Sequence, residues 1–146
     1  GMSLAEQLEV VHQIFLDTAP VIYFVEKNPF FAPRLQRLFD RLDAGELMAV
    51  VSPITLAECL VLPYKLGKPD AVQIFTDLLV SSGNVWFYPL DETIADKSAE
   101  LRARYNLTLT DAFQVAIAIQ TGCDAFLTND RGLKRVTDIP ILVISE

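Results

Sequence analysis

The stretch LTLTDAFQVAIAIQTGCDAFLTNDRGL, residues 107–133, places a long apolar segment between two acidic positions. Residues 112–119 are apolar on nearly every side, which is typical of a helix in the middle of a fold. Asp111, after Thr110, stands where this helix is expected to begin, and Gly122 stands where a left-handed residue is expected to end it. We therefore expect a buried helix with a carboxylate at its start.

A short apolar run follows this helix and leads directly into the second acid. Residues 125–128 are predicted to form a buried strand, and Asn129 and Asp130 come immediately after it. Strand ends and helix starts face the same edge of an open parallel sheet, which is where such folds bind ligands. Two acids at that edge, Asp111 and Asp130, suggest a metal site.

The rest of the chain alternates between strand and helix patterns. Further strands are predicted at residues 10–16, 47–51, 85–88 and 140–144. Helices are predicted at residues 21–26, 31–43, 54–62, 70–82 and 91–105, with single helical turns within 2–9 and at 133–136. Pro63 is expected to kink or end the helix that begins at residue 54. This alternation predicts an α/β fold, a three-layer α/β/α sandwich with a mostly parallel five-stranded sheet.

Length and composition limit the class of protein. The 146 residues are expected to form a single domain, 1–146, with residues 1–9 as a short N-terminal extension. The apolar fraction of 51% includes no run close to the roughly 18 residues that a membrane span needs. We read the apolar excess as core plus a partner or dimer surface.

The charge and the cysteines exclude further classes. A net charge of −7 argues against a protein that coats nucleic acid with a broad basic face, but not against an enzyme that contacts it at one metal-bridged point. Cys59 and Cys123 are isolated, which indicates neither a zinc site nor a disulfide framework. Isolated cysteines and the lack of a signal peptide lead us to expect a cytoplasmic protein.

Two more acids complete a set with Asp111 and Asp130. Asp17 ends the first predicted strand, and Glu58 lies on an apolar side of the helix that begins at residue 54. Taken singly, the three aspartates have structural readings, as turn or helix-capping residues. Glu58 differs, because no basic residue stands three or four positions away, and a glutamate on an apolar face is rarely buried unless it is paired or binds a metal.

The four acids are more informative as a set than one at a time. All four can converge on one sheet edge, where clustered carboxylates without local cations repel one another. A hard divalent cation makes such a cluster favourable, and ligation by oxygen alone points to Mg²⁺ or Mn²⁺ rather than zinc.

Four separated segments carry a resemblance to a known family. FLDTAPVIYFVE, SPITLAECL, LTLTDAFQVAIAIQTG and AFLTNDRGL together resemble a PIN-domain nuclease, most of all the toxin ribonucleases of VapBC toxin–antitoxin pairs. The resemblance covers residues 12–144 in order and spacing. It departs from the family at Ala19, where many relatives have Ser or Asn, and at Pro63.

The resemblance implies roles for particular residues. Its catalytic and metal-binding acids fall on Asp17, Glu58, Asp111 and Asp130. Thr128 and Asn129 match the polar residues that support the last acid, and they are candidates to position substrate or water. Arg131 and Lys134, together with Arg135, are the local candidates for contacts with substrate phosphates. The alternative interpretation is that these basic residues only form a solvated turn of helix.

The implied function is hydrolysis of RNA phosphodiester bonds with Mg²⁺ or Mn²⁺, by the toxin of a toxin–antitoxin pair. The implied partners are the RNA substrate, a small antitoxin and a second copy of the chain. An antitoxin's apolar segment is expected near Phe30, Phe31, Pro29 and Pro33, unless these rings fill the core. His12, which begins the first strand, is not needed as a base.

Three alternatives remain. One is a non-catalytic PIN-like binding module, and another is a PIN nuclease that acts in RNA processing or on DNA. A phosphatase-like hydrolase with Asp17 as nucleophile is disfavoured, since it needs an aspartate two residues later and position 19 is Ala.

Overall fold

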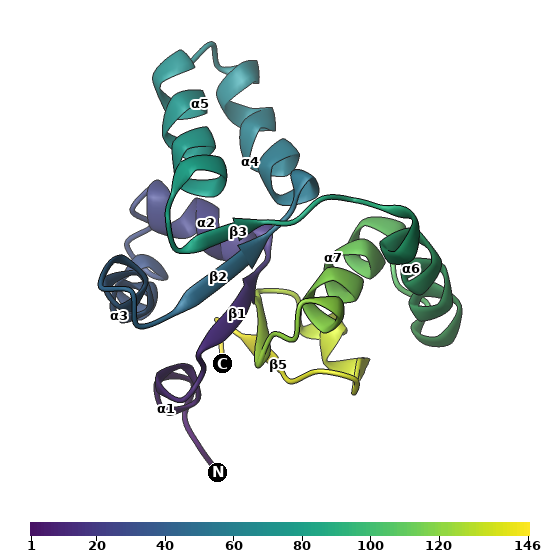
Figure 1. The fold of residues 1–146 in the computed structure, drawn as a ribbon. Helices are drawn as coiled ribbons and strands as arrows, with labels where there is room; N and C mark the ends of the chain where they lie inside the picture. The colour runs from purple at the N-terminus through teal and green to yellow at the C-terminus, as the bar shows by residue number, and fades with distance from the viewer.

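A five-stranded sheet forms the centre of the structure, a computed structural model that describes residues 1–146 (Figure 1). Its strands lie in the order β3-β2-β1-β4-β5, and every neighbouring pair is parallel. The strands are β1 Gln13–Leu16, β2 Met48–Val51, β3 Val85–Phe87, β4 Ala125–Thr128 and β5 Ile141–Val143. The predicted sheet is confirmed, and it is wholly rather than mostly parallel.

Helices connect the strands as the alternation predicts. They are α1 Leu4–Glu9, α2 Thr18–Val25, α3 Ala32–Asp43, α4 Pro53–Lys65, α5 Pro69–Thr76, α6 Glu92–Tyr105 and α7 Leu109–Gln120, with a π-helical turn η1 Asp77–Ser81 and a 3-10 turn η2 Arg131–Arg135. The predicted helix 70–82 is therefore shorter, because its last turn widens into η1. None of the helices combines the length and the apolar character that crossing a membrane requires.

Side chains that alternate along the strands build a core on each face of the sheet. Ile14 and Leu16 of β1 pack with α1, α2 and α3 on one face, whereas Phe15 packs with α6 and α7 on the other. Phe15 stacks on Phe126 of β4 with ring centroids 5.0 Å apart. Figure 1 shows the resulting three layers, with α2 and α3 on one side of the sheet and α6 and α7 on the other.

The central helix α7 is buried as predicted, but it begins earlier. Thr108, not Thr110, is its N-cap, and the Thr108 hydroxyl accepts a hydrogen bond from the N–H of Asp111. Asp111 therefore lies in the first turn. Gly122 follows the helix with a φ of +72°, the left-handed conformation that ends a helix at low cost for a residue without Cβ.

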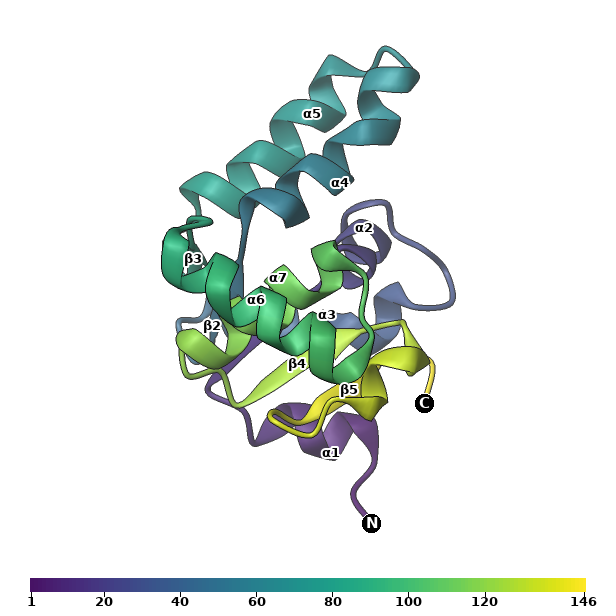
Figure 2. The same cartoon turned by 90° about the vertical axis from the view of Figure 1, so that its right-hand side faces the viewer.

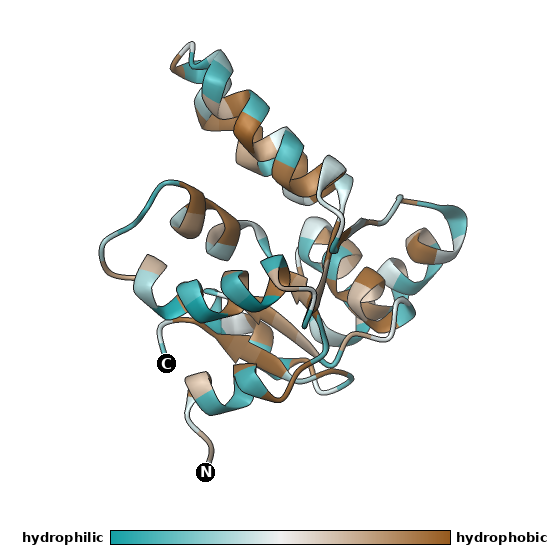
Figure 3. Ribbon diagram, turned by 60° about the vertical axis from the view of Figure 1, so that its left-hand side comes forward, coloured by the Kyte–Doolittle hydropathy of each residue, from teal (hydrophilic) through white to brown (hydrophobic).

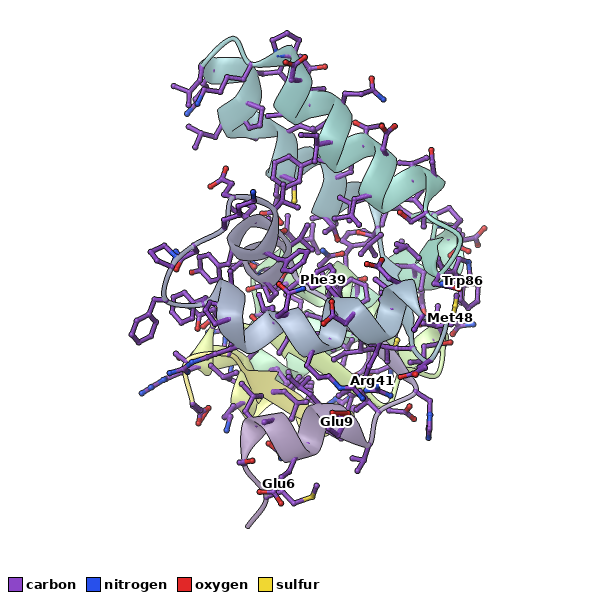
Figure 4. All side chains as sticks on the ribbon, turned by 90° about the vertical axis from the view of Figure 1, so that its left-hand side faces the viewer. Glu6, Glu9, Phe39, Arg41, Met48 and Trp86 are labelled. Carbon is purple, nitrogen blue, oxygen red and sulfur yellow. The ribbon has the colours of Figure 1, made fainter.

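The first predicted strand, residues 10–16, begins only at Gln13. The carboxylate of Asp124 accepts the backbone N–H groups of both His12 and Gln13, which holds this segment as a turn before the strand. The preceding helix α1 is tied to α3 through Arg41, whose guanidinium donates to the carbonyl groups of Leu8 and Val11. Figure 4 shows Arg41 of α3 pointing toward Glu9 of α1.

One expectation about α4 is wrong. The helix neither ends nor breaks at Pro63 but continues to Lys65, and Pro63 is buried inside it. Proline already has the φ that a helix needs, but it lacks the N–H that would have bonded to the carbonyl of Cys59, and its ring crowds that carbonyl. With α5, α4 forms a helical hairpin that projects away from the sheet (Figure 2).

Candidate active site

Asp17 lies where the chain order of the sheet reverses. β1 is flanked by β2 and β4, and the N–H of Asp17 donates to the carbonyl of Leu127 in β4 at 2.9 Å. Asp17 is the N-cap of α2, and its Oδ1 accepts from the N–H of Thr18 at 2.9 Å. Its Oδ2 accepts from the hydroxyl of Thr128 at 2.8 Å. Both carboxylate oxygens are thereby oriented.

The surroundings of Asp17 disfavour its negative charge. Burial is the largest of the effects that together raise the pKa of Asp17 to about 6; the charges of Asp111 and Glu58 add to the rise, and the hydrogen bonds from Thr128 and Thr18 oppose it. Asp17, Asp111 and Glu58 are thus close enough to repel one another.

Glu58 is held by α2, but it is not buried as the sequence pattern suggests. The hydroxyl of Thr18 donates to Glu58 Oε1 at 2.7 Å, and Oε2 has no partner. Glu58 is exposed, and its apolar neighbours Val61 and Leu62 are 51% and 50% exposed. The apolar side of α4 faces solvent because the hairpin leaves the body of the protein there. Next to Ala19, Thr18 thus places a hydroxyl group against Glu58.

Asp111 faces the other acids from the first turn of α7. Partial burial raises its pKa, and the charges of Asp130 and Glu58 add to that rise, while the Thr108 hydroxyl and the charge of Arg135 oppose it. Asp111 is thus within electrostatic reach of each of the other three acids, Asp17, Glu58 and Asp130.

Thr128 connects the last acid to the first. Its hydroxyl, which donates to Asp17, also accepts the N–H of Asp130 at 3.0 Å. Asp130 then caps η2 by accepting the N–H of Gly132 at 2.8 Å. Thr128 is 0% exposed, so the structure gives it a positioning role and no surface for the predicted contact with substrate.

Asn129 points toward α2 rather than toward solvent. Its Nδ2 donates to the hydroxyl of Tyr23 at 3.1 Å, and its Oδ1 is buried without a hydrogen-bond partner. Tyr23 in turn stacks on Phe31, with ring centroids 4.5 Å apart. Asn129 thus helps to join the end of β4 to α2.

The residues predicted to contact phosphate differ in whether their side chains already have a partner within the chain. Arg131 is exposed and forms neither an ion pair nor a hydrogen bond. Lys134 is paired with Glu146 at 2.7 Å. Arg135 donates to the carbonyl groups of Tyr105, Asn106 and Gly132, so its role is structural.

The acids suit a hard cation by their chemistry. They offer oxygen donors alone, and none of them forms a salt bridge with a basic side chain. In the present side-chain positions, no three of them come close enough together to hold one ion. Burial is the main cause of the raised pKa values of Asp17 and Asp111, and the repulsion between acids that adds to it is what a divalent cation would remove.

A buried polar network lies next to the acids and was not predicted from the sequence. Gln114 of α7 is 1% exposed; its Oε1 accepts from the hydroxyl of Ser52, and its Nε2 donates to the hydroxyl of Thr55 at 2.9 Å. This network fixes the start of α4 against α7, and so fixes Glu58 relative to Asp111. The one signal for it is a glutamine inside an otherwise apolar helix.

A wide groove of the molecule contains none of the four acids. It has a volume of about 910 Å³ and lies between α2, α3 and the α5–η1 segment. It is lined mainly by apolar groups, including those of Phe24, Val25, Pro29, Pro33, Ile74 and Leu78. Its composition fits an apolar partner segment better than a phosphodiester.

Solved structures share this fold. A chain of the DNA-bound VapBC complex of Salmonella typhimurium matches 91% of this chain and 98% of its own length, at 18% identity and a TM-score of 0.71. The sarcin–ricin loop cleaving toxin VapC20 of Mycobacterium tuberculosis matches 87% and 98%, at 16% identity and 0.67. A toxin–antitoxin complex of Klebsiella pneumoniae matches 90% and 97%, at 19% identity and 0.67.

The sequence itself gives a family assignment. Comparison with curated proteins yields no match. Residues 14–139, which include all four acids, most of β1 and all of β2, β3 and β4, match the family described as PIN domain. The chain therefore belongs to the PIN domain family.

Proposed function

We propose that this chain is a metal-dependent endoribonuclease that acts as the toxin of a toxin–antitoxin pair. The observation that carries the proposal is a set of four carboxylates without basic partners at the ligand-binding edge of a PIN-domain sheet, where Asp111 is repelled by each of the other three. The fold shared with a toxin that cleaves the sarcin–ricin loop supports RNA as the substrate.

Asp17, Glu58, Asp111 and Asp130 would hold Mg²⁺ or Mn²⁺. When bound, such an ion supplies Lewis-acid polarisation of the phosphodiester and activation of the attacking water. The acids of the chain differ in what they add. Asp17 is oriented at both oxygens by Thr18 and Thr128, which suits a ligand that must keep its direction.

Proton transfer and substrate orientation fall to less constrained groups. Glu58 keeps Oε2 free and exposed, so we assign it the proton of the attacking water. Arg131 has an unpaired guanidinium one residue after Asp130, which suits a contact to a substrate phosphate. His12 lies before β1, at the opposite edge of the sheet from Asp17, and takes no part.

The apolar groove between α2, α3 and α5 is the proposed antitoxin site. Pro29 and Pro33 line it, in agreement with the antitoxin contact expected from the sequence. Phe30 is 64% exposed, and Phe31 is half-buried against Tyr23, so Phe30 does not fill the core and Phe31 does so only in part. The toxin–antitoxin and VapBC complexes with this fold support a small protein partner.

A second copy of the chain is a further proposed partner. Val61, Tyr64 and Leu66 of the hairpin are 51%, 68% and 55% exposed, which is much apolar surface for a projecting element. A homodimer would cover part of it through the same patch on both copies. Light scattering on the purified chain at high micromolar concentration tests this part, and a monomer there counts against it.

The test of the function is cleavage of RNA and of DNA by the purified chain, free of any antitoxin. We expect RNA cleavage with Mn²⁺ or Mg²⁺ that EDTA abolishes. The matched control is Asp111→Asn, which keeps the volume of the side chain and removes its charge, and it should be inactive after the same purification. Cleavage that survives either EDTA or this substitution would come from a contaminating nuclease. Metal-dependent cleavage of DNA alone would favour a PIN nuclease that acts on DNA. Binding of nucleic acid or protein without cleavage would favour a non-catalytic PIN-like binding module.

A further inference from the structure

The basic side chains of this acidic protein divide by whether they have a partner. Of the 12 Lys and Arg residues, most are committed to ion pairs or to backbone carbonyl groups. The side chains of Lys27, Lys65, Lys68 and Arg131 are exposed and form neither. Lys65 and Lys68 stand together at the tip of the α4–α5 hairpin, where α4 ends and α5 begins.

Lys65 stands on the same side of α4 as Glu58. The helix runs without interruption from Pro53 to Lys65. A separation of seven residues is close to two full turns, so the two side chains leave the helix in nearly the same direction, about 10 Å apart along its axis. Leu62, one turn beyond Glu58, lies between them and is 50% exposed. The hairpin thus carries a row of carboxylate, apolar side chain and ammonium group away from the proposed active site.

A cleft lies beside this row and shares Leu62 with it, whereas Glu58 and Lys65 do not line it. It has a volume of about 390 Å³ and is lined by Leu62, Pro63, Leu66 and Lys68 of the hairpin, by Ala71 of α5 and by Glu26 after α2. Its walls come from α4, from α5 and from the end of α2, and α4 and α2 also meet at the hydrogen bond between Thr18 and Glu58. The cleft therefore lies beside the row that leads outward from Glu58, between the same two helices.

The lining suits one strand of nucleic acid better than a duplex. Unpaired lysines attract phosphate groups, whereas Leu62 and Leu66, 50% and 55% exposed, offer apolar surface to bases and riboses. A single strand can present both its phosphates and its bases to such a cleft. A duplex presents its phosphates and keeps its bases stacked inside.

We propose that the α4–α5 hairpin is a second substrate-binding element, in which Lys65 and Lys68 hold a neighbouring part of the single strand that is cut at the four acids. The proposal rests on the proposed nuclease function. It implies that the chain binds a stretch of RNA that extends beyond the phosphodiester that is cut. Figure 2 shows the hairpin standing above the body of the protein, and Figure 3 shows apolar turns along it. One carboxylate opposes the arrangement, that of Glu26, which shares the cleft with Lys68 but forms no ion pair with it.

The first experiment measures binding without cleavage. In an Asp111→Asn background with Mn²⁺, fluorescence anisotropy follows a labelled RNA of about ten nucleotides, within the range that such grooves cover. Lys65→Ala and Lys68→Ala should each weaken binding about three- to tenfold, and the slope of log K against log salt should fall by about 0.7 for each phosphate that the variant no longer neutralises. Glu26→Gln should tighten binding. Lys97→Ala is the matched control, because it removes the same charge from α6, where Lys97 already pairs with Glu100.

The second experiment measures cleavage in the chain that keeps Asp111. Lys65→Ala and Lys68→Ala should raise the KM for the long RNA and leave hydrolysis of bis(p-nitrophenyl) phosphate, which has no strand to hold, within about twofold. If the unchanged chain cleaves neither substrate, the proposed nuclease function fails, and the binding experiment still decides about the hairpin. Binding that is the same for the hairpin variants and for Lys97→Ala overturns this inference. So does a change in self-association in place of RNA binding, which would make the hairpin a protein-binding surface.

Discussion

The hydroxyl of Thr128, at the end of β4, donates a 2.8 Å hydrogen bond to Oδ2 of Asp17, at the end of β1. The same oxygen of Thr128 accepts the N–H of Asp130 at 3.0 Å. One buried hydroxyl therefore sets the positions of two proposed metal ligands that lie 113 residues apart in the sequence.

Thr128→Val should damage activity more than folding. Valine keeps the shape but leaves Oδ2 of Asp17 and the N–H of Asp130 each without a partner, which costs on the order of 1–3 kcal/mol of unfolding free energy for a buried site. Loss of a group that orients a metal ligand reduces activity or metal affinity about 10- to 100-fold. Urea unfolding and kcat/KM for RNA measure the two effects. Thr128→Ser, which restores the hydroxyl, should recover most of the activity, and failure to do so would mean that packing matters more than the hydrogen bond.

Without metal, Asp17 should make stability depend on pH. Its folded-state pKa of about 6 lies above the value near 3.9 expected in an unfolded chain. The folded state then binds more protons than the unfolded state between these values, so this residue's contribution to stability is lost as pH rises from about 4 to 6. Asp17→Asn should remove this dependence and raise stability in EDTA at pH 7.5 by on the order of 1–3 kcal/mol. Thermal melts of both proteins from pH 4.5 to 7.5 give the comparison, and equal pH profiles would contradict it.

Glu58→Gln should separate metal binding from folding. Glutamine keeps an acceptor for the Thr18 hydroxyl, and position 58 is exposed, so apo stability should be at least that of the unchanged protein at pH 7.5. Added Mn²⁺ at 100 times its Kd should stabilise the unchanged protein by about 2.7 kcal/mol and the variant by less. The measurement is a set of melts with and without Mn²⁺. Equal metal shifts in both proteins would remove Glu58 from the metal site.

Gln114→Leu should destabilise the junction between α4 and α7. The hydroxyl groups of Ser52 and Thr55 would lose their buried partner, at about 1–3 kcal/mol. Gln120→Leu in the same helix is the control, since Gln120 is exposed and its replacement should change stability by less than about 0.5 kcal/mol. Urea unfolding of both variants decides, and equal midpoints would show that the network adds nothing to stability.

The groove between α2, α3 and α5 should bind an antitoxin through exposed apolar groups. Ile74→Glu places a charge in the groove at a side chain that is 55% exposed, and Phe30→Ser removes a ring that is 64% exposed and directly follows the groove residue Pro29. Each substitution should weaken binding of a co-expressed small protein, encoded by the neighbouring gene, at least about tenfold. The thermal melt of the free chain should remain nearly unchanged, because neither side chain is buried. Copurification and calorimetry measure the first effect. Full binding by both variants would exclude the groove as the antitoxin site.

Local sequence determined the elements and the edge at which the acids lie. The apolar run of residues 112–119 and the capping groups Asp17 and Asp91 act within a few residues of themselves, so the helices they belong to follow from periodicity and hydrogen-bonding chemistry alone. Because the strands are parallel, acids that follow strands or begin helices must meet at one edge, and Asp111 and Asp130 do so.

Tertiary structure decided the roles that depend on distant segments. Lys134 resembles a free phosphate-binding group until Glu146 pairs with it, and Thr128 resembles a surface group until Asp17 and Asp130 enclose its hydroxyl. The side of α4 that carries Glu58 and Leu62 has the pattern of a buried face, yet it is exposed. Apolar periodicity shows which side of a helix avoids water, but it does not show whether the same chain supplies the surface that covers it. Here α4 and α5 project beyond the sheet, so that side remains open.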